Sequence, residues 1–175
     1  MKPHLIRLTL LIAFLTLFSN CKKPTVFKEV QIGNLFTMQV PGYMSAGEGT
    51  YPFPVAMNYN SDSAAVFLMV IDTLRKGMNE NALKMYYDSV VNEPFIDSAK
   101  ISPALLVKVN NDSAYTSEMT GVLNGVKVFY EMEAIATPER YFMILTWGKK
   151  DNMESLKPDM LKMLSSFCDL SHKKI

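Results

Sequence analysis

The sequence is poor in cysteine, histidine and glycine-rich motifs, and these absences exclude several common kinds of site. The 175 residues include two cysteines and two histidines, which are too few for the four Cys and His ligands of a structural zinc site. No Gly-x-Gly-x-x-Gly, P-loop or Gly-x-Ser-x-Gly pattern occurs, so neither a phosphate-binding loop nor a hydrolase nucleophile is indicated. We therefore predict no metal, no cofactor and no catalytic residue, and we interpret the chain as not an enzyme.

Acidic residues are missing from the beginning of the chain. The first is Glu29, whereas Lys2 and Arg7 precede an apolar run at residues 8–18. As a helix this run would be about 16 Å long, roughly half the thickness of a bilayer core, so it is too short to span a membrane. A basic start followed by a short apolar run is typical of a secretory signal peptide.

The apolar run ends in the sequence LFSNC at residues 17–21. This stretch resembles the lipobox of bacterial lipoproteins, in which an aliphatic residue and small residues precede a cysteine. The resemblance implies that residues 1–20 are a signal peptide and that Cys21 carries diacylglycerol and an N-acyl lipid, followed by a lipidated tether at 21–25. Each buried methylene adds about 0.8 kcal/mol, so several acyl chains would hold the protein at a membrane. The alternative is a plain secreted protein with Cys21 near its cleavage site.

The chain that would remain after cleavage has no excess of positive charge. Removal of Lys2 and Arg7 leaves 16 basic and 17 acidic side chains, which argues against nucleic acid as a partner. Cys168 would be the remaining thiol beside Cys21, so we expect no disulfide. The start CKKPT carries no acidic residue. From its resemblance to other bacterial lipoproteins, we expect an outer-membrane lipoprotein that faces the periplasm of the cell envelope.

Residues 26–168 are expected to form a single α+β domain. Apolar alternation and turn signals predict strands at 26–32, 35–40, 64–73, 104–110, 113–123, 125–136 and 141–148. Apolar residues spaced by three and four predict helices at 79–95 and 151–168. This order indicates an antiparallel β-sheet of about six to eight strands with two main helices packed on it. Residues 169–175 are expected to form a frayed, polar tail.

Several local signals predict turns and the course of the last helix. Gly33-Asn34 and Asn124-Gly125 are typical two-residue hairpin turns. Asp151 with Glu154 three residues later matches a capping box at the start of the helix. Pro158 lies inside the same helix and predicts a kink or a restart.

Two stretches of the sequence resemble the PsbP-like fold group. LFTMQVPGYM at 35–44 is similar to that group's first strand with its proline and aromatic residue, and RYFMILTWG at 140–148, running into MLKMLSSF, is similar to its closing strand and helix. The resemblance implies a PsbP-like domain over most of residues 26–168. It implies no functional residue, because proteins with this fold perform different tasks.

Acidic side chains form one cluster in the predicted sheet. If the turn at Asn124-Gly125 has two residues, Glu118 pairs opposite Glu131, and Glu133 lies on the same face as Glu131. Such carboxylates can work as a general acid and base. They can also be the solvated face of an open sheet, and we favour this interpretation.

The loop at residues 43–54 holds apolar side chains that no periodic core explains. Tyr43, Met44, Tyr51 and Phe53 stand among glycines and prolines. Such a loop is either a packed cover over a sheet end or a contact surface. Both interpretations stay open, and these four residues are our candidates for partner binding. Most of the methionines are expected to fill the core.

Three functions are compatible with these patterns. The first is a non-enzymatic, membrane-anchored module for protein binding or assembly, using the 43–54 loop and an adjoining sheet edge to hold another envelope protein. The second is a carrier of a small apolar ligand in a cavity between the sheet and the C-terminal helix, lined by Met153, Met160 and Trp147. In either case Trp147 would be a half-buried anchor. The third is an enzyme that uses the carboxylate cluster.

Overall fold

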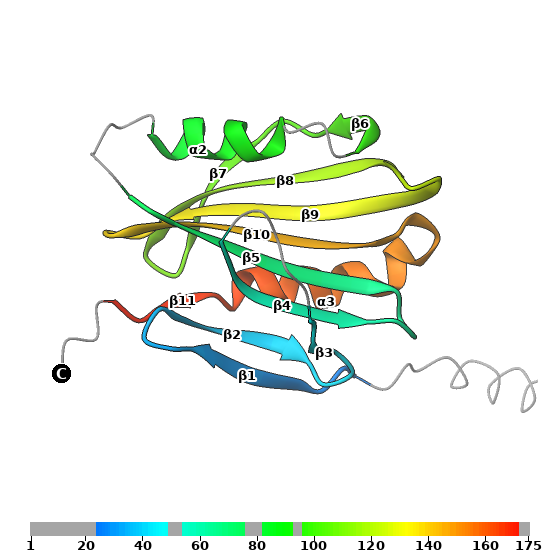
Figure 1. Cartoon of the computed structure of the whole chain (residues 1–175), viewed down its shortest axis with the longest axis horizontal. Helices are drawn as coiled ribbons and strands as arrows, with labels where there is room; N and C mark the ends of the chain where they lie inside the picture. The colour runs from blue at the N-terminus through cyan, green and yellow to red at the C-terminus, as the bar shows by residue number, and fades with distance from the viewer. Residues whose placement is uncertain (1–23, 49–53, 76–81, 93–95, 172–175) are drawn as a thin grey trace, which may run out of the picture.

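The structure is a computed structural model that describes residues 24–48, 54–75, 82–92 and 96–171. These residues form two antiparallel sheets and two α-helices (Figure 1), which confirms the predicted α+β fold. The expected signal peptide and Cys21 lie outside the described residues, so cleavage and lipidation stay predictions. Among the helices that the structure describes, none is long and apolar enough to cross a membrane.

The larger sheet has eight strands in the order β3-β4-β5-β10-β9-β8-β6, and β7 pairs with β8 beside β6. The strands are β3 (Ser45–Ala46), β4 (Val55–Ser61), β5 (Val66–Leu74), β6 (Asp97–Ile101), β7 (Leu105–Val109), β8 (Asp112–Leu123), β9 (Val126–Ala136) and β10 (Arg140–Lys149). Strands β7 to β10 form successive hairpins. The predicted turn at Asn124 and Gly125 is confirmed, and both residues have positive φ.

The smaller sheet contains β1 (Phe27–Ile32), β2 (Phe36–Pro41) and β11 (Cys168–Asp169). Strands β1 and β2 form the predicted hairpin, whose turn includes Gly33 at a φ of +49°. Glycine adopts this left-handed conformation without steric cost.

The prediction of a frayed tail from residue 169 is wrong at its beginning. Cys168 and Asp169 pair with β2 as strand β11, and the Leu170 N–H donates a hydrogen bond to the Leu35 carbonyl at 2.9 Å. The chain after α3 therefore lies along the free edge of β2 and forms backbone hydrogen bonds there. The polar composition of this segment does not predict the pairing.

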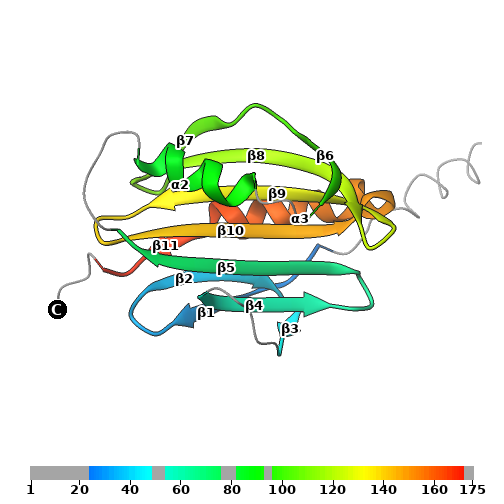
Figure 2. The ribbon, with the colours of Figure 1, turned by 45° about the horizontal axis from the view of Figure 1, so that its top comes forward.

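The two helices cover opposite faces of the larger sheet. Helix α2 (Ala82–Val91) packs on β8, β9 and β10 through Leu83, Tyr87 and Val91. Helix α3 (Met153–Ser165) packs on the other face against β9 and β10 and also contacts β2 of the smaller sheet. Figures 1 and 2 show the larger sheet between the two helices.

Alternate residues of each central strand supply two separate cores. In β5, Leu68 and Val70 join the core beneath α3, whereas Met69 and Ile71 join the core beneath α2. This strand is therefore covered on both faces. The methionines are mainly core residues, as expected, and the buried ones are Met38, Met44, Met57, Met69, Met119, Met132, Met143, Met160 and Met163.

The start of α3 differs from the prediction. A 3-10 turn (Lys150–Asn152) precedes the helix, and the N-cap residue Asn152 makes no side-chain capping hydrogen bond. The predicted capping box of Asp151 and Glu154 is therefore wrong. The helix also continues through Pro158 without a restart. Proline removes one helical hydrogen bond, whose acceptor would be the carbonyl of Glu154, and Glu154 is exposed to water.

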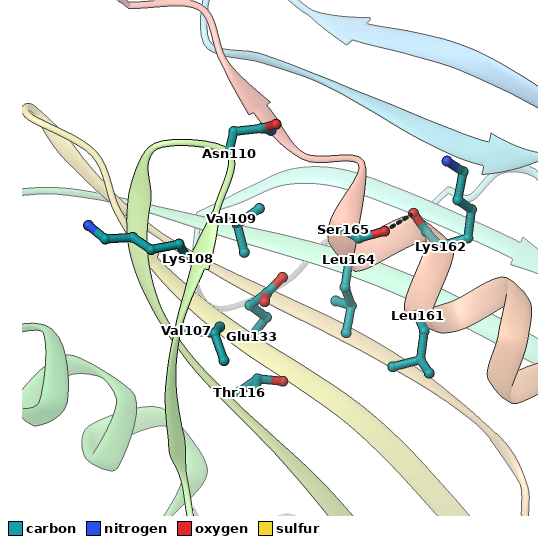
Figure 3. Close-up of a pocket in the computed structure, with 10 residues that line it drawn as sticks. All are labelled: Val107, Lys108, Val109, Asn110, Thr116, Glu133, Leu161, Lys162, Leu164 and Ser165. Carbon is teal, nitrogen blue, oxygen red and sulfur yellow. Dashed lines mark hydrogen bonds between the residues drawn. The ribbon is translucent and has the colours of Figure 1, made fainter.

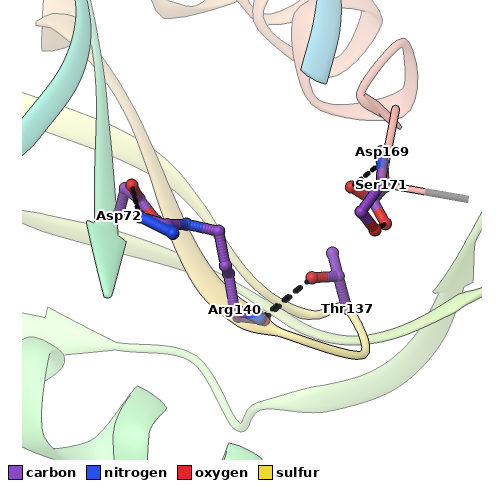
Figure 4. A network of polar contacts seen from close by, with 5 residues as sticks. All are labelled: Asp72, Thr137, Arg140, Asp169 and Ser171. Atoms are coloured by element: carbon purple, nitrogen blue, oxygen red, sulfur yellow. Dashed lines mark hydrogen bonds and ion pairs between the residues drawn. The ribbon is translucent and has the colours of Figure 1, made fainter. Parts of the chain in front are cut away.

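A polar network joins the β9–β10 turn to β5. The Arg140 Nε and Nη2 atoms donate to the two Asp72 carboxylate oxygens, each at 2.6 Å (Figure 4). Thr137 pairs with the Arg140 backbone across the turn, and Arg75 donates to the Thr137 carbonyl at 2.8 Å. These contacts hold together the neighbouring ends of β5, β9 and β10.

Candidate functional site

The acidic residues predicted to cluster on β8 and β9 do lie together. Glu118 is opposite Glu131 in the β8–β9 register, as the hairpin turn predicts. Glu131 and Glu133 are only 3% and 5% exposed, so the interpretation of a solvated sheet face is wrong. Helix α3 packs on this face of β9 and removes both carboxyl groups from water.

Lys157 of α3 contacts two of the three carboxyl groups. Its Nζ atom lies 2.7 Å from Glu118 Oε1 and 3.2 Å from Glu131 Oε1. Burial raises the pKa of Glu131, and the hydrogen bond and charge of Lys157 oppose this rise. Lys157 thus offsets part of the negative charge of the two facing carboxylates, which repel each other across the strands.

Glu133 differs from its two neighbours because no positive charge compensates its burial. Its Oε2 atom is buried and has no hydrogen-bond partner among the described residues. Burial raises the pKa of Glu133 to about 7, because an apolar environment disfavours the ionised form. A buried polar atom without a partner costs about 1–3 kcal/mol, so this carboxyl group is a candidate for ligand contact.

Glu133 lines a groove of about 440 Å³ between α3 and the β7–β8 hairpin. Its lining comprises Val107, Lys108, Val109, Asn110, Thr116, Glu133, Leu161, Lys162, Leu164 and Ser165. Figure 3 shows the Glu133 carboxyl group between β7 and α3, with valine side chains on one side and leucine side chains on the other. The groove therefore has apolar walls and a single acidic group.

This groove is where the carrier hypothesis places a cavity, but its predicted lining is wrong. Met160 is fully buried in the core beneath α3. Trp147 belongs to the opposite face, where it stacks on Phe67 at 5.2 Å and on Tyr130 at 5.6 Å between ring centroids. Trp147 is half-buried, as predicted. Trp147 packs with the core beneath α2, whereas Met160 belongs to the core beneath α3, so these two residues cannot line one cavity.

The predicted partner-binding loop is described only in part. Tyr43 is 40% exposed, and its hydroxyl donates to Asp159 of α3 at 2.8 Å. Burial and the Asp159 carboxylate raise the Tyr43 pKa. Met44 is fully buried and belongs to the core, so its side chain is not on the surface. Tyr51 and Phe53 lie outside the described residues.

The structure also reveals an exposed apolar edge that sequence reasoning missed. Strands β6 and β7 lie end to end along β8, with Pro103 between them. Ile101, Leu105 and Leu106 are 39%, 63% and 65% exposed on these strands. Because proline in a sheet is confined to edges and bulges, Pro103 could have placed this segment at an edge.

Two observations bear on metal ligands and on the free thiol in the described part of the chain. No group of three or more His, Cys, Asp or Glu residues there could hold a metal ion. Cys168 is a half-buried free thiol.

Comparison with known proteins identifies the fold. No protein-family model and no curated protein sequence matches this chain. Among solved structures, cyanobacterial PsbP (CyanoP) from Synechocystis sp. PCC 6803 matches with a TM-score of 0.63 and 11% identity, covering 87% of this chain and 98% of its own. The chain therefore has a PsbP-like fold, as the two sequence stretches suggest.

Two further structures share this fold with low sequence identity. LpqN, involved in cell envelope biogenesis of Mycobacterium tuberculosis, matches with a TM-score of 0.62 and 9% identity over 85% of this chain and 87% of its own. The Saccharomyces cerevisiae Ran-binding protein Mog1p matches with a TM-score of 0.55 and 12% identity over 84% of this chain and 97% of its own. At these identities the likeness establishes the fold alone.

Proposed function

We propose that this chain is a lipoprotein of the bacterial cell envelope whose PsbP-like domain is a non-enzymatic protein-binding module. The lipobox-like sequence ending at Cys21 supports the anchor. The names of two proteins with this fold support the role, since LpqN is involved in cell envelope biogenesis and Mog1p binds Ran. In this proposal the domain faces the periplasm from the outer membrane, and its partner is another envelope protein.

The exposed edge formed by β6 and β7 carries the proposal. Leu105 and Leu106 are the most exposed leucines that the structure describes, and Ile101 lies beside them in the same segment. Within the described residues, β8 is the only strand that pairs with β6 or β7. An unpaired apolar edge can accept an extended strand from another protein. The partner strand would gain backbone hydrogen bonds and would cover apolar surface.

Site-specific crosslinking in intact cells tests this docking edge. A photoreactive amino acid at position 106 should yield a discrete adduct with one envelope protein. Position 85 is a matched control, because Met85 is 64% exposed on α2 and Leu106 is 65% exposed on β7. Replacement Leu105→Lys in the chain labelled at 106 should abolish the adduct, because a lysine on an edge disfavours strand addition.

Two results would contradict the proposed edge. The first is an equal pattern of adducts from positions 106 and 85. The second is an adduct from position 106 that persists after Leu105→Lys.

A further inference from the structure

The groove beside α3 has the composition of a small-molecule site. Val107 and Val109 of β7 face Leu161 and Leu164 of α3 across it, and Glu133 lies between them (Figure 3). Ligand sites in proteins combine apolar walls with a few polar groups that orient the ligand. Here the walls would take a hydrocarbon body, and Glu133 would orient a polar end.

Most other polar groups of the groove already have partners inside the protein. The Thr116 hydroxyl donates to the Met132 carbonyl at 3.1 Å, and the Ser165 hydroxyl donates to the Lys162 carbonyl at 3.3 Å. The Asn110 amide donates to the Phe167 carbonyl. Glu133 Oε2 differs from these groups, because it is buried and has no hydrogen-bond partner among the described residues.

The neighbouring cations do not compensate Glu133. Lys157 of α3 is engaged with Glu118 and Glu131, and Lys108 of β7 donates to Ser113 at 2.9 Å. Figure 3 shows the head groups of Lys108 and Lys162 directed away from the Glu133 carboxyl group. Among the described residues, no cation forms an ion pair with Glu133.

We propose that this groove binds a small apolar molecule that carries one protonated amine. The ammonium group would donate a hydrogen bond to the Glu133 carboxylate, and the hydrocarbon body would lie between the valines of β7 and the leucines of α3. A charge-assisted hydrogen bond of this kind is stronger than a neutral one, above all where water is excluded. This ligand site is proposed in addition to the protein-binding role, and the proposal does not depend on that role.

The ionisation of Glu133 gives amine binding a characteristic pH dependence. The Glu133 pKa of about 7 means that the carboxyl group is largely neutral near pH 6 and largely ionised near pH 8. An ammonium ion binds the ionised form, so its affinity should rise about tenfold between these pH values. The charged groups nearby are Glu131, Glu118 and Lys157, which neutralise one another in part, and Lys108 of β7 and Lys162 of α3, which line the groove.

Three probes of the same shape separate the contribution of charge from that of apolar contact. Cyclohexylamine, cyclohexanol and cyclohexanecarboxylate differ only in the polar group. We would titrate each into the full chain in lipid nanodiscs by calorimetry, with empty nanodiscs as the reference, near pH 6 and near pH 8. The amine should bind more tightly than the other two near pH 8, and it should weaken about tenfold near pH 6.

Two variants locate the interaction. Glu133→Gln should remove both the preference for the amine and its pH dependence. Leu161→Arg, at an exposed wall position, should place a competing cation in the groove and also weaken amine binding. Met85→Arg on the opposite face is the matched control and should leave binding unchanged.

The proposal would be overturned by any of three results. These are failure of the amine to bind the unaltered chain near pH 8, equal binding of amine and alcohol near pH 8, and unchanged amine binding by both Glu133→Gln and Leu161→Arg.

Discussion

Glu133 is a single residue whose charge state bears on the stability of the whole fold. Its pKa is about 7 in the folded protein, against an ordinary value of 4.5. Between these values the folded chain keeps a proton that the unfolded chain has released. The free energy of unfolding should therefore fall as the pH rises through this window, and the loss should be complete above about pH 7.

Replacement Glu133→Gln should remove this pH-dependent cost, because glutamine has a similar shape and no charge. We expect the free energy of unfolding to increase by about 3 kcal/mol near pH 8 and to change little near pH 4. Urea unfolding of both proteins at the two pH values measures the difference. The exposed Glu139 provides a control, since Glu139→Gln should have little effect at either pH. An equal loss of stability at both pH values would contradict this prediction. It would show that Glu133 stabilises the fold through a contact and that burial of its charge does not destabilise it.

The burial of Glu133 could not be predicted from the sequence, although its strand face could. The alternation of β9 and the turn at Asn124-Gly125 predict which face carries Glu131 and Glu133, and which residue lies opposite Glu131. They do not predict that α3 covers that face, because the position of a helix on a sheet depends on packing between segments far apart in the chain. Without the position of the helix, the sequence pattern therefore predicts that two carboxyl groups on one strand face are solvated.

At the scale of elements, hairpins are predictable because their signals are local. Strands β8, β9 and β10 follow from alternation and turn residues within a short window. Strand β11 has only two residues and no periodicity, and it exists because β2 offers an unpaired edge. The edge position of β6 and β7 is likewise a property of the assembled sheet, although Pro103 is a local indication of it.

Strand β11 gives a prediction for the smaller sheet. A chain that ends at residue 167 should lose about 1–2 kcal/mol of stability, because the hydrogen bonds along β2 are removed. Amide exchange in β2 should become faster in this variant. A chain that ends at residue 171 keeps β11 and the bond from Leu170 to Leu35, and it should match the full chain. Equal protection of β2 amides in both truncated chains would show that β11 contributes nothing to the sheet.

At the scale of the whole molecule, the larger sheet is covered on both faces, while its β6–β7 edge pairs with no further strand of the described residues. Helix α2 covers one face, and α3 together with the smaller sheet covers the other. The exposed leucines of β7 and the groove beside α3 both lie at the β7–β8 end of the sheet. Contacts with other molecules should concentrate at that end.

The envelope role depends on Cys21, and the mature N-terminus tests it most directly. Mass spectrometry of the protein isolated from membranes of its native cells should find Cys21 as the first residue, with a mass increase that matches diacylglycerol and an N-acyl chain. In cells that carry Cys21→Ser, the lipid should be absent and the protein should leave the membrane fraction. An unmodified N-terminus at another residue, in a protein that is not associated with membranes, would contradict the proposed anchor.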